Sequence, residues 1–135
     1  MEQEKLINSI HTLQSILKLA VPEINNGGCL IFAYQMCKHL NSKNIQANIR
    51  IDSDKNQFIS KDPDINHAWV YLPKYNLCFD GLEFIAWSKP YQFKLDFNPE
   101  NERSVLESIR NPRIWNHSYP RIKTPIVRFL IKSLI

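Results

Sequence analysis

The chain has 135 residues, of which 44% are hydrophobic and 22% are charged, and its formal net charge at neutral pH is +4. These values are typical of one soluble domain over residues 1–135 that needs neither a disulfide nor a metal to hold its core. No stretch approaches the roughly 18 to 20 consecutive apolar residues of a membrane span, and the acidic start is unlike a secretory signal. We therefore expect a cytoplasmic protein with no membrane partner.

The first part of the chain predicts two helices. Apolar residues recur at helical spacing over residues 6–20, and this helix should end before Pro22. The cluster Asn25-Asn26-Gly27-Gly28 is typical of a turn. A second helix should then run over about residues 29–40, with most of its apolar residues on one face.

The middle of the chain predicts short strands. Polar and apolar residues alternate around residues 47–51, and the polar segment 52–64 that follows should be a long surface loop. Two further strands are expected near 67–72 and 77–80, and residues 82–87 are expected to form a third. The strands that follow one another closely should pair.

Two further helices are predicted, each from a proline-containing sequence that is typical of a helix start. Asn98-Pro99 and Thr124-Pro125 each place a capping residue directly before a proline at the first helical position. The first of these helices should end at Arg110. The second is short and amphipathic, so we expect it to pack on the core.

The three cysteines are Cys29, Cys37 and Cys78, an odd number with no CxxC pair. That pattern argues against a zinc knuckle or a thioredoxin-like site, although Cys29, His67 and Cys78 leave a zinc site as a minor alternative. We expect no metal and no cofactor. For any single cysteine, the ordinary role is that of a small buried apolar residue.

Cys29 differs from the other two because it opens a predicted helix directly after a glycine pair. Unpaired N–H groups and the positive end of the helix dipole favour a thiolate there, which is the nucleophilic form. His67 and Asp80 follow on neighbouring predicted strands. If Leu72 pairs with Leu77, Asp80 lies diagonal to His67 on the same face, and a slip by one residue would separate them. The order suits a nucleophile, a base and an orienting carboxylate.

The ordered set Gly28-Cys29, His67-Ala68-Trp69-Val70 and Phe79-Asp80 resembles the transglutaminase-like branch of the papain-like cysteine protease superfamily, over about residues 26–81. The resemblance implies an α+β fold in which a helix carrying Cys29 packs on a small antiparallel sheet, with additional C-terminal helices. It also implies Cys29 as nucleophile, His67 as general base and acid, and Asp80 as the residue that orients His67.

The chemistry implied by this resemblance passes through a thioester acyl-enzyme. We therefore expect a cysteine-dependent hydrolase or acyltransferase that acts on an amide or ester bond of a peptide, a protein side chain or a conjugate. The acceptor of the acyl group is left open, because a shared fold does not determine it.

The sequence does not single out a donor for the oxyanion of such a reaction. The side-chain candidates upstream of the cysteine are Asn25, Asn26 and Gln14. The backbone N–H of Cys29 is a candidate for a second donor. Gly28 would leave room for the substrate beside the sulfur, and Trp69 is expected in the core or in the wall of the groove.

Two other functions fit parts of the sequence. A catalytically silent binding or effector protein would keep the fold and capture a protein partner in the cleft. From Arg103 onward, seven residues are basic and only Glu107 is acidic, which fits an acidic partner or nucleic acid. Nucleic acid is disfavoured because no basic and aromatic motif accompanies the charge. The oligomeric state is left open.

Overall fold

The computed structural model describes residues 2–22, 24, 29–53, 65–85, 92–96 and 124–135. Within these ranges, the chain forms an α+β fold. Its elements in chain order are α1 (Gln3–Ala20), α2 (Cys29–Ser42), β1 (Asn48–Ser53), β2 (Ile65–Leu72), β3 (Leu77–Phe79), β4 (Phe84–Ile85), β5 (Gln92–Asp96) and α5 (Thr124–Leu134).

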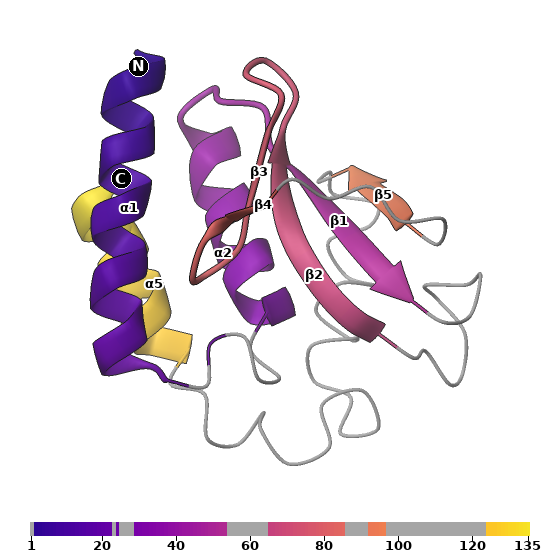
Figure 1. The fold of residues 1–135 in the computed structure, drawn as a ribbon. Coiled ribbons are helices and arrows are strands. Elements are labelled where there is room, and N and C mark those ends of the chain that lie inside the picture. Colours follow the sequence, from indigo (N-terminus) through magenta and orange to yellow (C-terminus); the bar gives the residue numbers. More distant parts are fainter. Residues whose placement is uncertain (1, 23, 25–28, 54–64, 86–91, 97–123) are drawn as a thin grey trace.

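The strands form one sheet in the order β4-β3-β2-β1-β5, and every neighbouring pair is antiparallel. Helix α2 packs on one face of this sheet against β2, and α5 packs on both α1 and α2. Figure 1 shows α2 between the sheet and α1, with α1 on the outside. The described helices therefore cover the same face of the sheet.

The core lies between the sheet and these helices. Alternate residues of β2 point into it, namely Ala68, Val70 and Leu72, all of which are fully buried. Helix α2 is buried around most of its circumference, including every residue from Cys29 to Tyr34. A helix that is apolar on nearly all sides suits a position between two layers.

The pairing of β2 with β3 confirms the register on which the proposed site depends. Leu72 pairs with Leu77, and Val70 pairs with Phe79. The strands are joined by the turn at 73–76, where Asn76 has a left-handed backbone conformation with φ of 51°. Asn tolerates that conformation better than most residues. Continued by one residue, this register places Asp80 opposite Trp69.

Several element boundaries differ from the predicted ones. Helix α1 begins at Gln3 and strand β2 begins at Ile65, both before their predicted starts. Helix α2 continues to Ser42, because the Asn41 side chain donates to the carbonyls of Cys37 (2.8 Å) and Ala47 (3.0 Å) and so supports the last turn. Strand β3 ends at Phe79, where the chain turns away. Strand β1 extends to Ser53, beyond the predicted end at Ile51.

The remaining predictions have mixed outcomes. Strand β5 was not predicted. Strand β4 covers Phe84–Ile85 of the strand expected over 82–87, of which residues 86–87 lie outside the described residues. Of the loop predicted over 52–64, residues 52–53 belong to β1, and the rest of it lies outside the described residues, as does the predicted helix over 98–110. Helix α5 has the expected bounds and packs on the core through Val127 and Ile131, which are buried.

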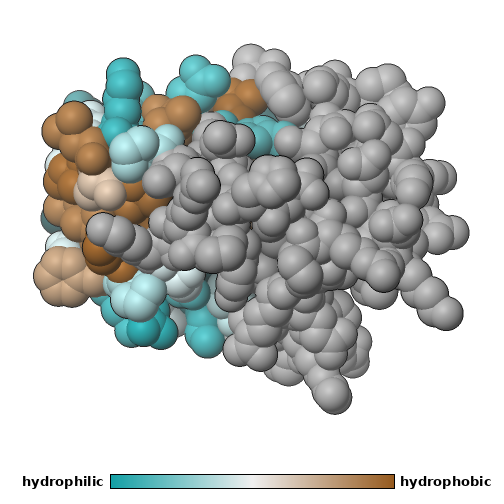
Figure 2. Space-filling view, turned by 90° about the horizontal axis from the view of Figure 1, so that it is seen from below, coloured by the Kyte–Doolittle hydropathy of each residue, from teal (hydrophilic) through white to brown (hydrophobic). Residues whose placement is uncertain are grey.

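An apolar patch lies on the outer side of α1 and α5. Leu19 is 85% exposed and Phe129 is 67% exposed, and Ile126 is also exposed. Figure 2 shows apolar surface gathered over these two helices, with hydrophilic surface at its borders. Among the described helices, none combines the length and the apolar character required to cross a membrane.

Candidate functional site

Cys29 is the first residue of α2, as the sequence predicts. The chain reaches it from α1 through a turn in which the Ile24 N–H donates to the Val21 carbonyl at 3.0 Å. The Cys29 side chain belongs to the buried core, and the residue is only 3% exposed. The first N–H groups of a helix have no partner within that helix, so the sulfur lies beside donors that favour negative charge.

Asp80 directly follows β3 and is held by its own turn. Its Oδ1 accepts hydrogen bonds from the backbone N–H groups of Leu82 (2.8 Å) and Glu83 (2.9 Å). Its own N–H donates to the Glu83 carbonyl at 3.0 Å. An aspartate that bonds the backbone two and three residues ahead is typical of a tight turn. These bonds fix the carboxylate and leave Oδ2 for a further partner.

That partner is His67, which lies on β2. Its Nε2 is 2.9 Å from Oδ2 of Asp80, within hydrogen-bonding distance. The imidazole also stacks on the ring of Trp69, with centroids 5.9 Å apart and planes inclined by 26°. Asp80 is buried, whereas the His67 side chain keeps 15% of its surface exposed. His67 is therefore oriented by two neighbours and still reaches the surface.

The charges around His67 favour its protonated form. Burial by itself lowers the pKa of His67, but the hydrogen bonds to Asp80 and to Cys29, together with the negative charges at both groups, outweigh burial and raise the pKa to about 9. The imidazole thus interacts with the sulfur on one side and the carboxylate on the other. Three elements therefore bring this group together: Cys29 begins α2, His67 lies on β2, and Asp80 directly follows β3.

No family model, curated protein or solved structure matches the chain. The function of the Cys29–His67–Asp80 arrangement must therefore be argued from its own geometry. What that geometry provides is a thiol, an imidazole and a carboxylate in sequence, with the carboxylate anchored by backbone donors.

The raised pKa of His67 predicts a specific loss of stability at alkaline pH. The pKa is about 9 in the folded protein and about 6.5 in an unfolded chain. The stabilisation is therefore complete below about pH 6.5 and is lost as the pH rises through 9, and it amounts to about 3 kcal/mol. Urea unfolding at about pH 6 and about pH 9.5 measures it. The His67→Gln variant should show a smaller loss, and an equal loss in both proteins would contradict the prediction.

The other two cysteines have environments that disfavour the thiolate. Burial raises the pKa of Cys37, which lies in the middle of α2. Burial also raises the pKa of Cys78, although a hydrogen bond from Trp69 and the charge of Arg50 act in the opposite direction. Among the described residues, the imidazole that favours the cation, His67, lies against Cys29.

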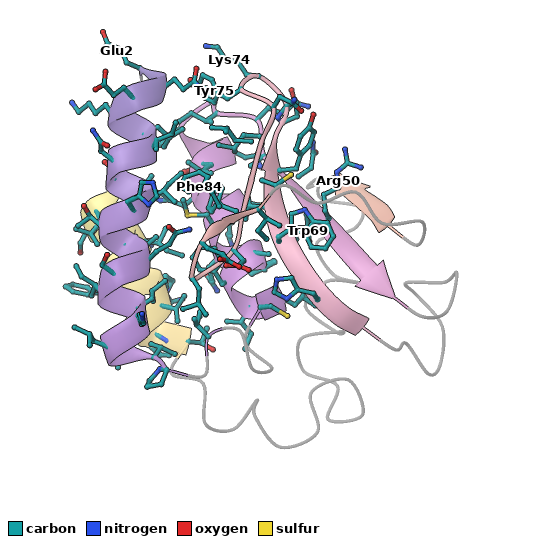
Figure 3. The ribbon with its side chains drawn as sticks, in the orientation of Figure 1. Glu2, Arg50, Trp69, Lys74, Tyr75 and Phe84 are labelled. Carbon is teal, nitrogen blue, oxygen red and sulfur yellow. The ribbon has the colours of Figure 1, made fainter. Side chains whose placement is uncertain are left out.

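Trp69 is buried like a core residue, which is the first of the two positions expected for it. It is fully buried, and one side of its ring system supports His67. Figure 3 shows Trp69 and Arg50 on the side of the sheet that faces away from α1, whereas Phe84 lies toward α1. Arg50 stacks on the ring of Tyr71 at 4.6 Å. Direct contact between Trp69 and a substrate stays a prediction.

The structure shows a hydrogen-bond partner for one oxyanion candidate, Gln14, and the other side-chain candidates stay predictions. The side-chain amide of Gln14 donates to the backbone carbonyl of Asp80 at 2.9 Å, so this donor is engaged in holding the Asp80 turn. Asn25, Asn26 and Gly28 lie outside the described residues. Sequence reasoning missed the link from Gln14 to Asp80, because the two residues are 66 positions apart. The only signal was a glutamine on the otherwise apolar face of α1.

Proposed function

We propose that this protein is a cysteine-dependent hydrolase or acyltransferase that acts on an amide or ester bond, with the transglutaminase-like or papain-like core that its sequence resembles. The observation that supports this most directly is the 2.9 Å bond between His67 Nε2 and Asp80 Oδ2, in a histidine that also interacts with Cys29. Cys29 is the nucleophile, His67 is the general base and acid, and Asp80 orients His67.

The hydrogen bond to Asp80 determines which nitrogen of His67 takes part in proton transfer. With Nε2 bonded to the carboxylate, Nδ1 is left for the proton of the Cys29 thiol. The resulting thiolate attacks the carbonyl carbon of the substrate, a C–S bond forms, and the carbonyl electron pair moves onto oxygen. Negative charge on Asp80 stabilises the imidazolium during this step.

Collapse of the tetrahedral intermediate restores the carbonyl and breaks the bond to the leaving group. His67 gives its proton to the departing nitrogen or oxygen, and a thioester to Cys29 remains. Water or an amine then attacks the thioester and loses its proton to His67 while the C–S bond breaks. The departing thiolate is left beside imidazolium, which restores the starting pair.

The backbone N–H of Cys29 is the proposed donor to the oxyanion. It belongs to the first turn of α2, where helix geometry leaves N–H groups without intrahelical partners. Its position next to the attacking sulfur suits the developing charge on the carbonyl oxygen. The substrate class that fits this chemistry is a peptide, a protein side chain, or an amide or ester conjugate, and the proposed reaction requires no cofactor.

Alkylation with iodoacetamide tests the proposed nucleophile without knowledge of the substrate. We expect Cys29 to react with iodoacetamide faster near neutral pH than Cys37 and Cys78 do, because His67 supplies a cation beside it. Cys37 and Cys78 should stay unmodified over the same range. Peptide mapping by mass spectrometry across a pH series measures both.

The matched control for this experiment is His67→Gln, which removes the cation and keeps the thiol. Its Cys29 should react more slowly near neutral pH than Cys29 of the unaltered protein. An equal rate of alkylation in the two proteins would contradict the proposed function.

Burial of Cys29 favours a second candidate, a catalytically silent binding protein with the same fold. The residue is only 3% exposed, so a bulky acyl group reaches the sulfur only if the chain around it moves. In that case a folded partner would bind over the site without turnover. Normal alkylation of Cys29 by iodoacetamide, combined with no acylation by a larger activated ester, would favour this candidate.

A further inference from the structure

The turn that carries Asp80 is packed against two residues that precede Cys29 in the chain. The first is Gln14 of α1, whose buried side chain donates from Nε2 to the backbone carbonyl of Asp80 at 2.9 Å. A buried carbonyl that loses its donor is left unsatisfied, which is unfavourable. This bond therefore holds the peptide plane between Asp80 and Gly81 in one orientation.

The second residue is Ile24, which packs directly on Gly81. A Cβ atom added at Gly81 would lie 2.6 Å from Cγ1 and 3.1 Å from Cγ2 of Ile24. Both are branch atoms next to the Ile24 backbone, so a side-chain rotation does not easily relieve the overlap. The contact exists because residue 81 has no side chain. Ile24 is fully buried and belongs to the short connection that leads to Cys29.

We propose that Gln14, Ile24 and Gly81 form a positioning clamp, which fixes the Asp80 carboxylate against His67 and joins the Asp80 turn to the chain segment that carries Cys29. The clamp acts through Asp80 and touches no reacting atom, so its members are positioning residues. The inference rests on the proposed function, because it takes Asp80 as the residue that orients His67.

The bonds within the Asp80 turn explain why a contact at Gly81 reaches His67. Oδ1 of Asp80 is tied to the N–H groups of Leu82 and Glu83, and the Asp80 N–H is tied to the Glu83 carbonyl. The turn therefore shifts as one unit, together with the carboxylate. A displacement of about 1 Å would move Oδ2 beyond hydrogen-bonding distance of Nε2.

The titration of His67 in the protein without substrate tests the clamp. The groups that face its ring are Asp80, Cys29 and the stacked Trp69. In Gly81→Ala, we expect the pKa of His67 to fall by about one unit, because the Asp80 carboxylate moves away from the ring. An NMR titration of the imidazole protons measures this pKa. Ile24→Ala removes Cγ1 and Cγ2, so the double variant Gly81→Ala/Ile24→Ala should recover most of that shift.

Gln14→Met provides the second arm, because it keeps the length of the side chain and removes the donor. Gln14→Met should also lower the pKa of His67. If Gly81→Ala does not fold, this variant alone tests whether the clamp positions Asp80. The control is Val127→Ala, a buried substitution on α5. It should lower the midpoint of urea unfolding and leave the His67 titration unchanged, which separates positioning from general stability.

Unchanged titration of His67 in folded Gly81→Ala and Gln14→Met would overturn the clamp. The result is independent of the proposed chemistry, because no turnover is measured. If both variants lower the pKa of His67 while Cys29 alkylates equally fast in the unaltered protein and in His67→Gln, the clamp stands and the proposed function fails.

Discussion

Replacing Cys29 with alanine is expected to lower the rate of acyl transfer by on the order of 10⁴-fold. The reason is that the C–S bond to this sulfur forms in the first proposed half-reaction and breaks in the second, so both steps need the thiol. A suitable assay uses p-nitrophenyl acetate as acyl donor and follows both the burst of nitrophenol and the mass of the acetylated protein. The burst should vanish in Cys29→Ala.

The matched control is Cys37→Ala, which changes a second buried cysteine of the same helix. Its thiol is held protonated by burial, which raises its pKa. The variant should keep the burst, even if its stability falls by the 1 to 3 kcal/mol or so that is typical of core changes. Acetylation that persists in Cys29→Ala at another residue would refute the assignment of the nucleophile.

Asp80→Asn is expected to have the second largest effect, a decrease in rate of about 10² to 10⁴-fold. The side chain keeps Oδ1 and its two backbone bonds, so the turn is preserved. The new amide presents N–H groups to Nε2 of His67, so Nε2 must accept and the proton of the neutral ring moves to Nδ1. A ring with its proton on Nδ1 cannot take the proton of Cys29.

The assay for Asp80→Asn combines the p-nitrophenyl acetate burst with the titration of His67. The pKa of His67 should fall, because the charge and hydrogen bond that raise it are weakened. The control is Glu83→Gln, which removes an exposed charge from the same turn and leaves the backbone bonds intact. A full burst in Asp80→Asn would show that Asp80 serves the turn alone.

Much of the fold could be predicted because its signals are local. The apolar spacing of α1 and α2, and the proline start of α5, depend on neighbours within a few turns. The register of β2 and β3 could be predicted for the same reason, since a four-residue turn joins them and Leu72 faces Leu77. That register in turn brings Asp80 to His67, so two members of the site follow from local rules.

Strand β5 could not be placed in the same way, although residues 92–96 alternate between polar and apolar types. It pairs with β1, and the partners in that pairing are far apart in the chain: Arg50 and Lys94 are 44 positions apart. Periodicity reports whether a segment suits a strand, and it carries no information about which distant strand will pair with it. The partner is chosen by the packing of the whole sheet.

What the sequence determined by itself was the identity and order of the proposed reacting groups, because a cysteine at a helix start, a histidine on a strand and an aspartate directly after the paired strand are set by local structure. What only the tertiary structure decided was how firmly these groups are held. The contact of Ile24 with Gly81 and the bond from Gln14 to Asp80 join residues that are more than fifty positions apart. Such contacts arise only when α1 and the Asp80 turn pack together, since burial and shape select them, and no spacing in the sequence encodes them.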